Sequence, residues 1–180
     1  MSSSDRSPPA TRRAFLALAG LLPAAGLALG ACGFQPLYGT NSAGQSVSNE
    51  LAAVRIAPLK ERSGQILHNL LRDRLNPYGQ PVEPRYQLSI AVSQVSEETG
   101  IRRDETASRA VLTLYASYSL VDAQGAVLTQ GQARSSSAYN ILDSSYASAV
   151  ARDDAQERAL TDLAEDLKLR LASYFSTRLT

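Results

Sequence analysis

The stretch TASRAVLTLYASYSLVD, residues 106–122, has the alternation of a long β-strand. Every second residue from Ala110 to Leu120 is apolar, and the residues between them are mostly polar. Successive side chains of a strand point to opposite faces, so the pattern predicts one face in a core and one face toward water. The expected core face comprises Ala110, Leu112, Leu114, Ala116, Tyr118 and Leu120.

Strands are also predicted on both sides of this stretch. Residues 122–125 (DAQG) favour a turn, because Gly125 can adopt a positive φ, and Ala126 to Tyr139 then forms an antiparallel fourth strand. The polar run 134–137 within it indicates an edge or a solvated face. Upstream, Arg85 to Gln94 alternates as a half-buried strand, and the charged segment Ser96 to Glu105 is expected to form an exposed hairpin tip.

Helices are predicted before and after these three strands. A short strand, Leu51 to Leu59, is followed by a helix with Ser63 as its N-cap, which ends at residues 76–79 (NPYG). The chain from Asp143 onward lacks Gly and Pro and is predicted to be one long helix, capped by Ser144 or Ser145. The apolar stripes of the two helices are Ile66, Leu67, Leu70, Leu71 and Leu75, and Leu160, Leu163, Leu167, Leu171 and Phe175.

The resulting order, β-α-β-β-β-α, predicts an α+β fold. Two amphipathic helices are expected to pack on one face of a mixed, roughly four-stranded sheet. The Ser and Thr side chains of the other face would then be partly solvated or covered by a partner. That open face is where we expect a partner to dock.

The N-terminal residues have the features of a secretory signal. Arg12 and Arg13 precede an apolar run, Ala14 to Leu29, which leads into Leu29-Gly30-Ala31-Cys32. The last four residues resemble a lipobox, which predicts cleavage before Cys32 and lipidation of its thiol. The alternative, a transmembrane helix with a structural cysteine, is weakened because the 16-residue run falls short of the roughly 20 residues that span a bilayer.

Two export routes are compatible with this signal. Residues 11–16 (TRRAFL) resemble a twin-arginine signal, although Ala17 stands where that signal usually has Lys. The two arginines also fit an ordinary positive n-region of the general secretory route.

These features divide the chain into three segments. We expect a cleaved lipoprotein signal peptide at residues 1–31, a lipidated tether at 32–50 and one α/β domain at 51–180. Several acyl chains are needed to hold such a domain at a bilayer. The tether is rich in Gly and Ser, but its apolar residues Phe34, Leu37 and Tyr38 leave open whether its first part is bound or only a spacer.

Composition argues against nucleic-acid binding and against catalysis. Without residues 1–31 the chain has 15 basic and 16 acidic residues, whereas nucleic-acid binders carry a basic excess. No cysteine besides Cys32 is present for a disulfide or a thiolate site, and we expect neither a metal nor a cofactor. His68 is the single histidine, and no GxSxG, HExxH or phosphate-loop motif accompanies it. We therefore expect a binding protein rather than an enzyme.

Arginines near the hairpin tip are the candidate binding residues. Arg102 and Arg103, with Arg109 and Arg134 on neighbouring strands, could form a cluster for an anionic head group, because the guanidinium binds phosphate in a bidentate manner. The alternative is local neutralisation by acidic neighbours, which are Glu97, Glu98, Asp104 and Glu105.

Residues 32–39, CGFQPLYG, resemble the beginning of the mature LptE lipoproteins, in particular those of the alphaproteobacterial type. The order of the predicted elements is also similar to that family. The resemblance implies two helices on a four-stranded sheet, a plug inside the β-barrel LptD, and a role in lipopolysaccharide transport to the outer membrane. Gly33, in place of the Asp that retains lipoproteins in the inner membrane, agrees with an outer-membrane location, with the domain on the periplasmic side or inside the barrel.

The resemblance also implies lipopolysaccharide contacts through basic residues of the sheet and its loops. Arg102, Arg103 and Arg134 occupy comparable elements here. Two other classes stay open: an auxiliary lipoprotein of an ABC-type envelope lipid transporter, and a small lipid-anchored hydrolase that would depend on His68.

Overall fold

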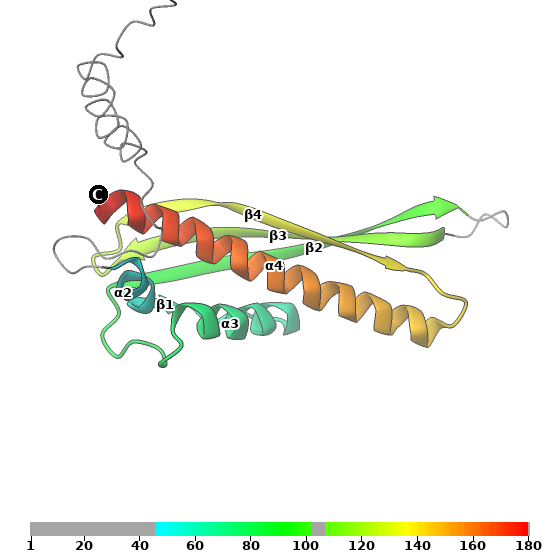
Figure 1. Ribbon diagram of the computed structural model, residues 1–180, viewed down its shortest axis with the longest axis horizontal. Helices are drawn as coiled ribbons and strands as arrows, with labels where there is room; N and C mark the ends of the chain where they lie inside the picture. The colour runs from blue at the N-terminus through cyan, green and yellow to red at the C-terminus, as the bar shows by residue number, and fades with distance from the viewer. Residues whose placement is uncertain (1–45, 102–106, 180) are drawn as a thin grey trace, which may run out of the picture. The chain divides into compact units, whose positions relative to one another are not determined.

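The computed structural model describes residues 46–101 and 107–179, which form an α+β domain (Figure 1). The elements, in chain order, are α2 (Val47–Ala52), β1 (Val54–Ile56), α3 (Arg62–Leu75), β2 (Tyr86–Ile101), β3 (Ala107–Asp122), β4 (Val127–Asn140) and α4 (Ser145–Leu179). The predicted fold class is confirmed.

The sheet is mixed, with the strand order β1-β2-β3-β4. β1 runs parallel to β2, and its three residues pair with Tyr86, Gln87 and Leu88. β2, β3 and β4 form an antiparallel meander. The predicted turn between β3 and β4 is present: Gly125 has a φ of 84°, and the Asp122 carboxylate accepts the N–H of Ala126 at 2.8 Å.

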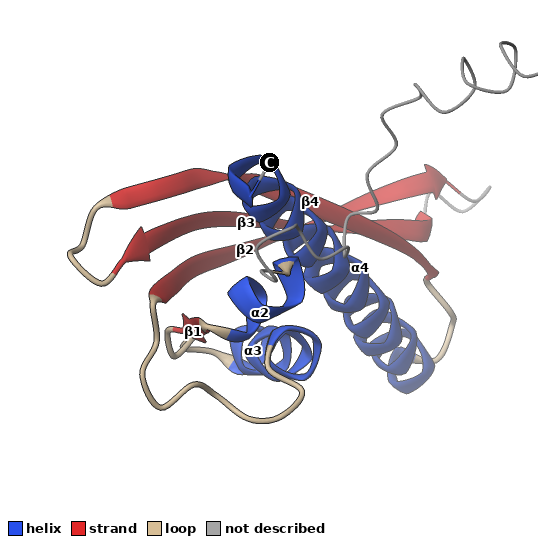
Figure 2. Ribbon diagram, turned by 60° about the vertical axis from the view of Figure 1, so that its left-hand side comes forward, coloured by secondary structure: helices blue, strands red, loops and turns tan. Residues whose placement is uncertain are grey.

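The helices bury one face of this sheet. All six residues of the predicted core face of β3 are buried, as are the five predicted apolar residues of α4. Leu67, Leu71 and Leu75 of α3 join the same cluster. Figure 2 shows α3 and α4 on the same side of the strands, which leaves the opposite face of the sheet without a described helix.

The beginning of the domain differs from the prediction. Residues 51 and 52 belong to α2 rather than to a strand, and β1 ends at Ile56 rather than Leu59. The helix forms because Ser46 accepts the N–H of Asn49 at 3.2 Å and because Val47 and Leu51, four residues apart, both bury their side chains. The expected boundary between residues 50 and 51 therefore falls inside a helix.

A buried carboxylate joins α2 to β2. Glu50, whose side chain is 7% exposed, accepts the Tyr86 hydroxyl at 2.7 Å and pairs with Arg85 at 3.1 Å. The Tyr86 ring lies 5.0 Å from that of Phe175 of α4. Burial raises the pKa of the Tyr86 phenol, and the hydrogen bond to the Glu50 carboxylate raises it further.

Two other predicted boundaries were wrong. The N-cap of α3 is Glu61, with φ 63° and ψ 158°, and Ser63 lies inside the helix. β2 continues through Thr99 to Ile101, into the segment expected to form the hairpin tip. Its charged residues are tolerated because they are exposed while their backbone pairs with β3. Ser144 is confirmed as a cap of α4, since its hydroxyl accepts the N–H of Ala147 at 3.4 Å.

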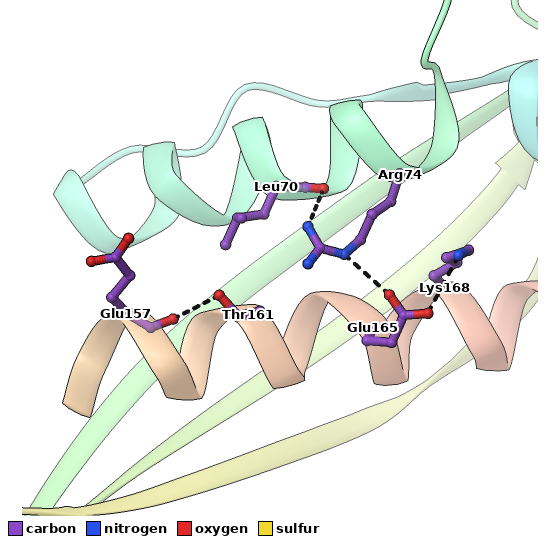
Figure 3. Close-up of polar contacts among 6 residues, drawn as sticks. All are labelled: Leu70, Arg74, Glu157, Thr161, Glu165 and Lys168. Atoms are coloured by element: carbon purple, nitrogen blue, oxygen red, sulfur yellow. Dashed lines mark hydrogen bonds and ion pairs between the residues drawn. The ribbon is translucent and has the colours of Figure 1, made fainter. Parts of the chain in front are cut away.

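Polar contacts fix α3 against α4 (Figure 3). The Arg74 guanidinium donates from Nε to Glu165 at 3.1 Å, and Lys168 donates to the other oxygen of the same carboxylate at 3.3 Å. Desolvation opposes ionisation of Glu165, but the hydrogen bonds from Lys168 and Arg74 outweigh it and lower its pKa. The Glu165 side chain is 46% exposed, so this contact orients the two helices more than it stabilises them.

Candidate functional site

The face of the sheet opposite the helices is the candidate binding surface. The register places Ala91 and Ser93 of β2, Tyr115 and Ser117 of β3, and Gln132 and Arg134 of β4 side by side on it. We call these six residues the open-face patch. Each of its side chains is exposed, as the alternation of the sequence predicted for this face.

A hollow of about 300 Å³ lies in this patch beside Tyr115. Its lining includes the small residues Ala91, Ser93 and Ser117, together with Gln132. The Tyr115 ring rises next to these short neighbours and is 43% exposed. A tyrosine presents an apolar ring and a polar hydroxyl, so this hollow suits the end of an amphipathic molecule.

Arg134 supplies the positive charge of the patch. It lies directly opposite Tyr115 in the antiparallel register, and its side chain is exposed. An arginine beside an apolar hollow can bind a phosphate or carboxylate while the ligand's apolar part lies against the tyrosine. The arrangement fits an anionic amphiphile.

Two arginines of the expected cluster, Arg109 and Arg134, lie on described strands. Arg102 and Arg103, like Cys32, lie outside the described residues. Arg109 shares the open face, but it pairs with Asn140, six residues along the strand from the Tyr115–Arg134 pair. Six residues of a strand span about 20 Å, so the structure does not bring Arg109 and Arg134 into one cluster.

The alternative catalytic residue lies elsewhere. His68 is on α3, and its Nδ1 is buried without a hydrogen-bond partner among the described residues. The described ranges contain no group of three or more His, Cys, Asp or Glu residues that could hold a metal ion. None of the helices in these ranges has the length and apolar character needed to cross a membrane.

The sequence signal for the hollow was present but incomplete. Tyr115 is the one large residue among the small, outward-facing residues of β3's central part, which the alternation predicts. Its neighbours Ala91 and Ser93 belong to β2, and only the strand register shows that they flank it.

Comparison with known families identifies the group to which this architecture belongs. The family described as "LptE: Lipopolysaccharide-assembly" matches residues 51–171, which includes all four strands and most of α4. The chain belongs to the LptE family. Its family therefore places it among the lipoproteins of lipopolysaccharide assembly in the Gram-negative envelope.

Solved structures with the same fold include other lipoproteins. A protein of Caulobacter crescentus CB15, described as a candidate lipoprotein, is 27% identical, with a TM-score of 0.60 over 72% of this chain and 96% of that one. The rare lipoprotein B of Shewanella oneidensis is 11% identical, with a TM-score of 0.53 over 70% of this chain and 96% of that one. The minor lipoprotein of Acinetobacter baumannii is 16% identical, with a TM-score of 0.53 over 67% of this chain and 88% of that one. No curated protein matches the chain.

Proposed function

We propose that this LptE-family protein is an outer-membrane lipoprotein that plugs an LptD-like β-barrel and supports lipopolysaccharide transport through it, without catalysing a reaction. The family match over residues 51–171 is the observation that carries the proposal. A domain that works inside or beside a barrel needs an exposed surface for its ligand or partner, and the open-face patch is such a surface.

The membrane attachment in this proposal depends on Cys32. Lipidation of its thiol holds the domain at the periplasmic side of the outer membrane, within reach of the barrel. The proposed barrel would also hold the domain at the membrane, so the test measures the intact mass of the purified protein: the wild type is expected to carry several acyl chains and Cys32→Ala none. A wild-type protein with an unmodified Cys32 would contradict the proposed anchor.

The lipopolysaccharide contact is proposed at Arg134, with Arg102 and Arg103 as further contacts near the hairpin tip. Lipopolysaccharide combines phosphate groups with acyl chains, which matches the guanidinium and the adjoining hollow of the open-face patch. We expect Arg134→Glu to weaken binding of purified lipopolysaccharide about ten-fold, and the pair Arg102→Glu and Arg103→Glu to weaken it as well.

A matched control is offered by Arg72, which is exposed on α3, away from the open face. Arg72→Glu changes the net charge by the same amount as Arg134→Glu. Because Arg72 lies away from the open face, lipopolysaccharide binding by this variant is expected to stay within about two-fold of the wild type. Equal losses in the Arg72 and Arg134 variants would show that binding depends only on net charge and would remove the assigned site.

The partnership is tested by extracting membranes with detergent, recovering the tagged full-length protein and identifying co-purified proteins by mass spectrometry. Recovery of one large outer-membrane β-barrel is the expected result. Recovery of inner-membrane transporter components would support an auxiliary lipoprotein of a lipid transporter instead.

A further inference from the structure

Within the described residues, one edge of the sheet is left unpaired over most of its length. β1 pairs with β2 only at Tyr86, Gln87 and Leu88, whereas β2 continues to Ile101. Among the described strands, none pairs with β2 on this side beyond Leu88. An edge strand of this kind presents a row of free N–H and C=O groups to any extended chain beside it.

The register identifies which backbone groups are free. The carbonyl of Leu88 faces β1, because it accepts the N–H of Ala57 at 2.8 Å. The N–H and C=O of one strand residue point to the same side and alternate between sides along the strand. β2 pairs with β3 without a register shift in this region, so Ile90, Val92 and Gln94 present both groups to the open edge.

Two hollows lie beside these three residues. One, of about 300 Å³, is formed where the segment 58–64 stands off from Ile90 and Val92. The other, of about 580 Å³, lies between the first turn of α3, Gln94 and the first half of α4. Both include Glu61 and Ser63, so the hollows adjoin at the start of α3. An added strand would have room for its backbone in the first and for a side chain in the second.

The second hollow has an acidic excess. Its charged lining consists of Glu61, Asp153, Asp154 and Glu157, against Arg62 and Arg152. Asp154 is paired with Arg158, and Figure 3 shows Glu157 extending toward the first turns of α3. A side chain that enters here from the edge is therefore favoured if it is basic.

The opposite edge of the sheet is protected in a way that the β2 edge is not. Arg158 of α4 donates to the carbonyl of Ala138 at 3.4 Å and to the Ser137 hydroxyl at 3.3 Å, at the end of β4. Covering an edge strand with a neighbouring helix is a recognised obstacle to strand addition. The contrast favours β2 as the edge at which another chain can pair.

We infer that the β2 edge from Ile90 to Gln94 accepts an extended segment of the protein partner as a fifth strand, with a Lys or Arg of that segment in the acidic hollow. Backbone hydrogen bonds supply affinity in this mode of recognition, and side-chain pockets supply specificity. The inference rests on the proposed function, since the partner is the β-barrel proposed above.

Proline substitution tests the edge selectively. Gln94→Pro removes an N–H that points to the open edge and puts the proline ring in its place. The sheet itself is expected to tolerate the change, because proline is accepted on the unpaired side of an edge strand. The matched control is Gln130→Pro. The Ala138 carbonyl points away from β3, since it accepts from Arg158, so the even-numbered residues of β4 present their backbone groups at the other edge. Gln130→Pro therefore removes an N–H at that edge. Melting temperatures of both variants establish that they fold.

We expect Gln94→Pro to reduce the recovery of the barrel from detergent extracts about ten-fold or more, and Gln130→Pro to leave it unchanged. A second variant, Asp153→Lys with Glu157→Lys, changes only exposed helical residues and is expected to reduce recovery as well. In the purified complex, hydrogen exchange of the β2 peptide that contains Ile90, Val92 and Gln94 should slow relative to the free protein.

The outcomes separate the two proposals. If the wild type recovers no barrel, the proposed function fails and this inference falls with it. If the wild type, Gln94→Pro and the double charge variant all recover the barrel equally, only the strand addition is overturned. If the purified wild type alone forms a dimer that Gln94→Pro dissociates, the edge binds a second copy of the chain and the assigned occupant is wrong.

Discussion

Replacing Glu50 with alanine tests whether α2 is a stabilising part of the domain. The change removes the acceptor of the 2.7 Å hydrogen bond from Tyr86 and the partner of Arg85. A hydrogen bond to a charged group contributes about 1.5–3 kcal/mol. The Arg85 side chain is 54% exposed, so its ion pair adds no more than about 1 kcal/mol. The expected loss in the free energy of unfolding is therefore about 1.5–4 kcal/mol.

Urea unfolding followed by circular dichroism at neutral pH measures this loss. Glu83→Ala is the control, since Glu83 is exposed in the loop before β2 and its replacement is expected to cost less than about 0.5 kcal/mol. A double-mutant cycle with Tyr86→Phe, which keeps the ring beside Phe175, isolates the Glu50–Tyr86 coupling at about 1.5–3 kcal/mol. If Glu50→Ala is no more destabilising than Glu83→Ala, α2 is a dispensable end of the tether and the reasoning is refuted.

Three further predictions concern packing, backbone strain and pH. Gly131→Ala would place a Cβ 2.9 Å from the Tyr118 hydroxyl oxygen, so we expect it to lower the unfolding free energy by about 1–3 kcal/mol, partly restored by Tyr118→Phe. The φ of 63° at Glu61 is strained for glutamate but not for glycine. Glu61→Gly is therefore expected to stabilise the fold by about 1 kcal/mol and to raise the melting temperature. A lower melting temperature would contradict the strain. The raised pKa of Tyr86 favours its neutral form in the folded state, so its contribution is complete below the ordinary phenol pKa of 10.0 and is lost as the pH rises through the folded value. Alkaline unfolding curves of the wild type and Tyr86→Phe should differ in that range.

Most of the fold could be predicted because its strands and long helices have strong periodicity. The alternation of β3 predicted each residue of its buried face, and the Leu spacing of α4 predicted each residue of its buried apolar stripe. The helix α2 was missed because six residues with two buried apolar side chains give too weak a periodic signal, and because its stability comes from contacts of Glu50 with β2. Tertiary contacts of this kind cannot be inferred from local pattern.

The candidate site could be predicted less completely. Alternation identified the open face. The place of Arg134 on it depends on the register of β4, and the hollow beside Tyr115 depends on which β2 residues stand next to β3. The free edge of β2 depends on where β1 stops, which is earlier than the apolar pattern of residues 51–59 suggested. Charged residues at the end of β2 also concealed its length, since a paired strand with both faces exposed has no hydrophobic alternation.

The packing of α2 against α4 makes the two ends of the domain depend on each other. α2 is the first described element to be synthesised and α4 is the last, so α2 remains without its main helical neighbour until the other described elements have been made. The contact between Tyr86 and Phe175 has the same character, because one ring begins the meander and the other lies close to the C-terminus. The strands of the meander, by contrast, meet neighbours that are adjacent in sequence. The hairpins can therefore form early during biogenesis, while the packing of α2, the end of the domain toward Cys32, waits for the last turns of α4.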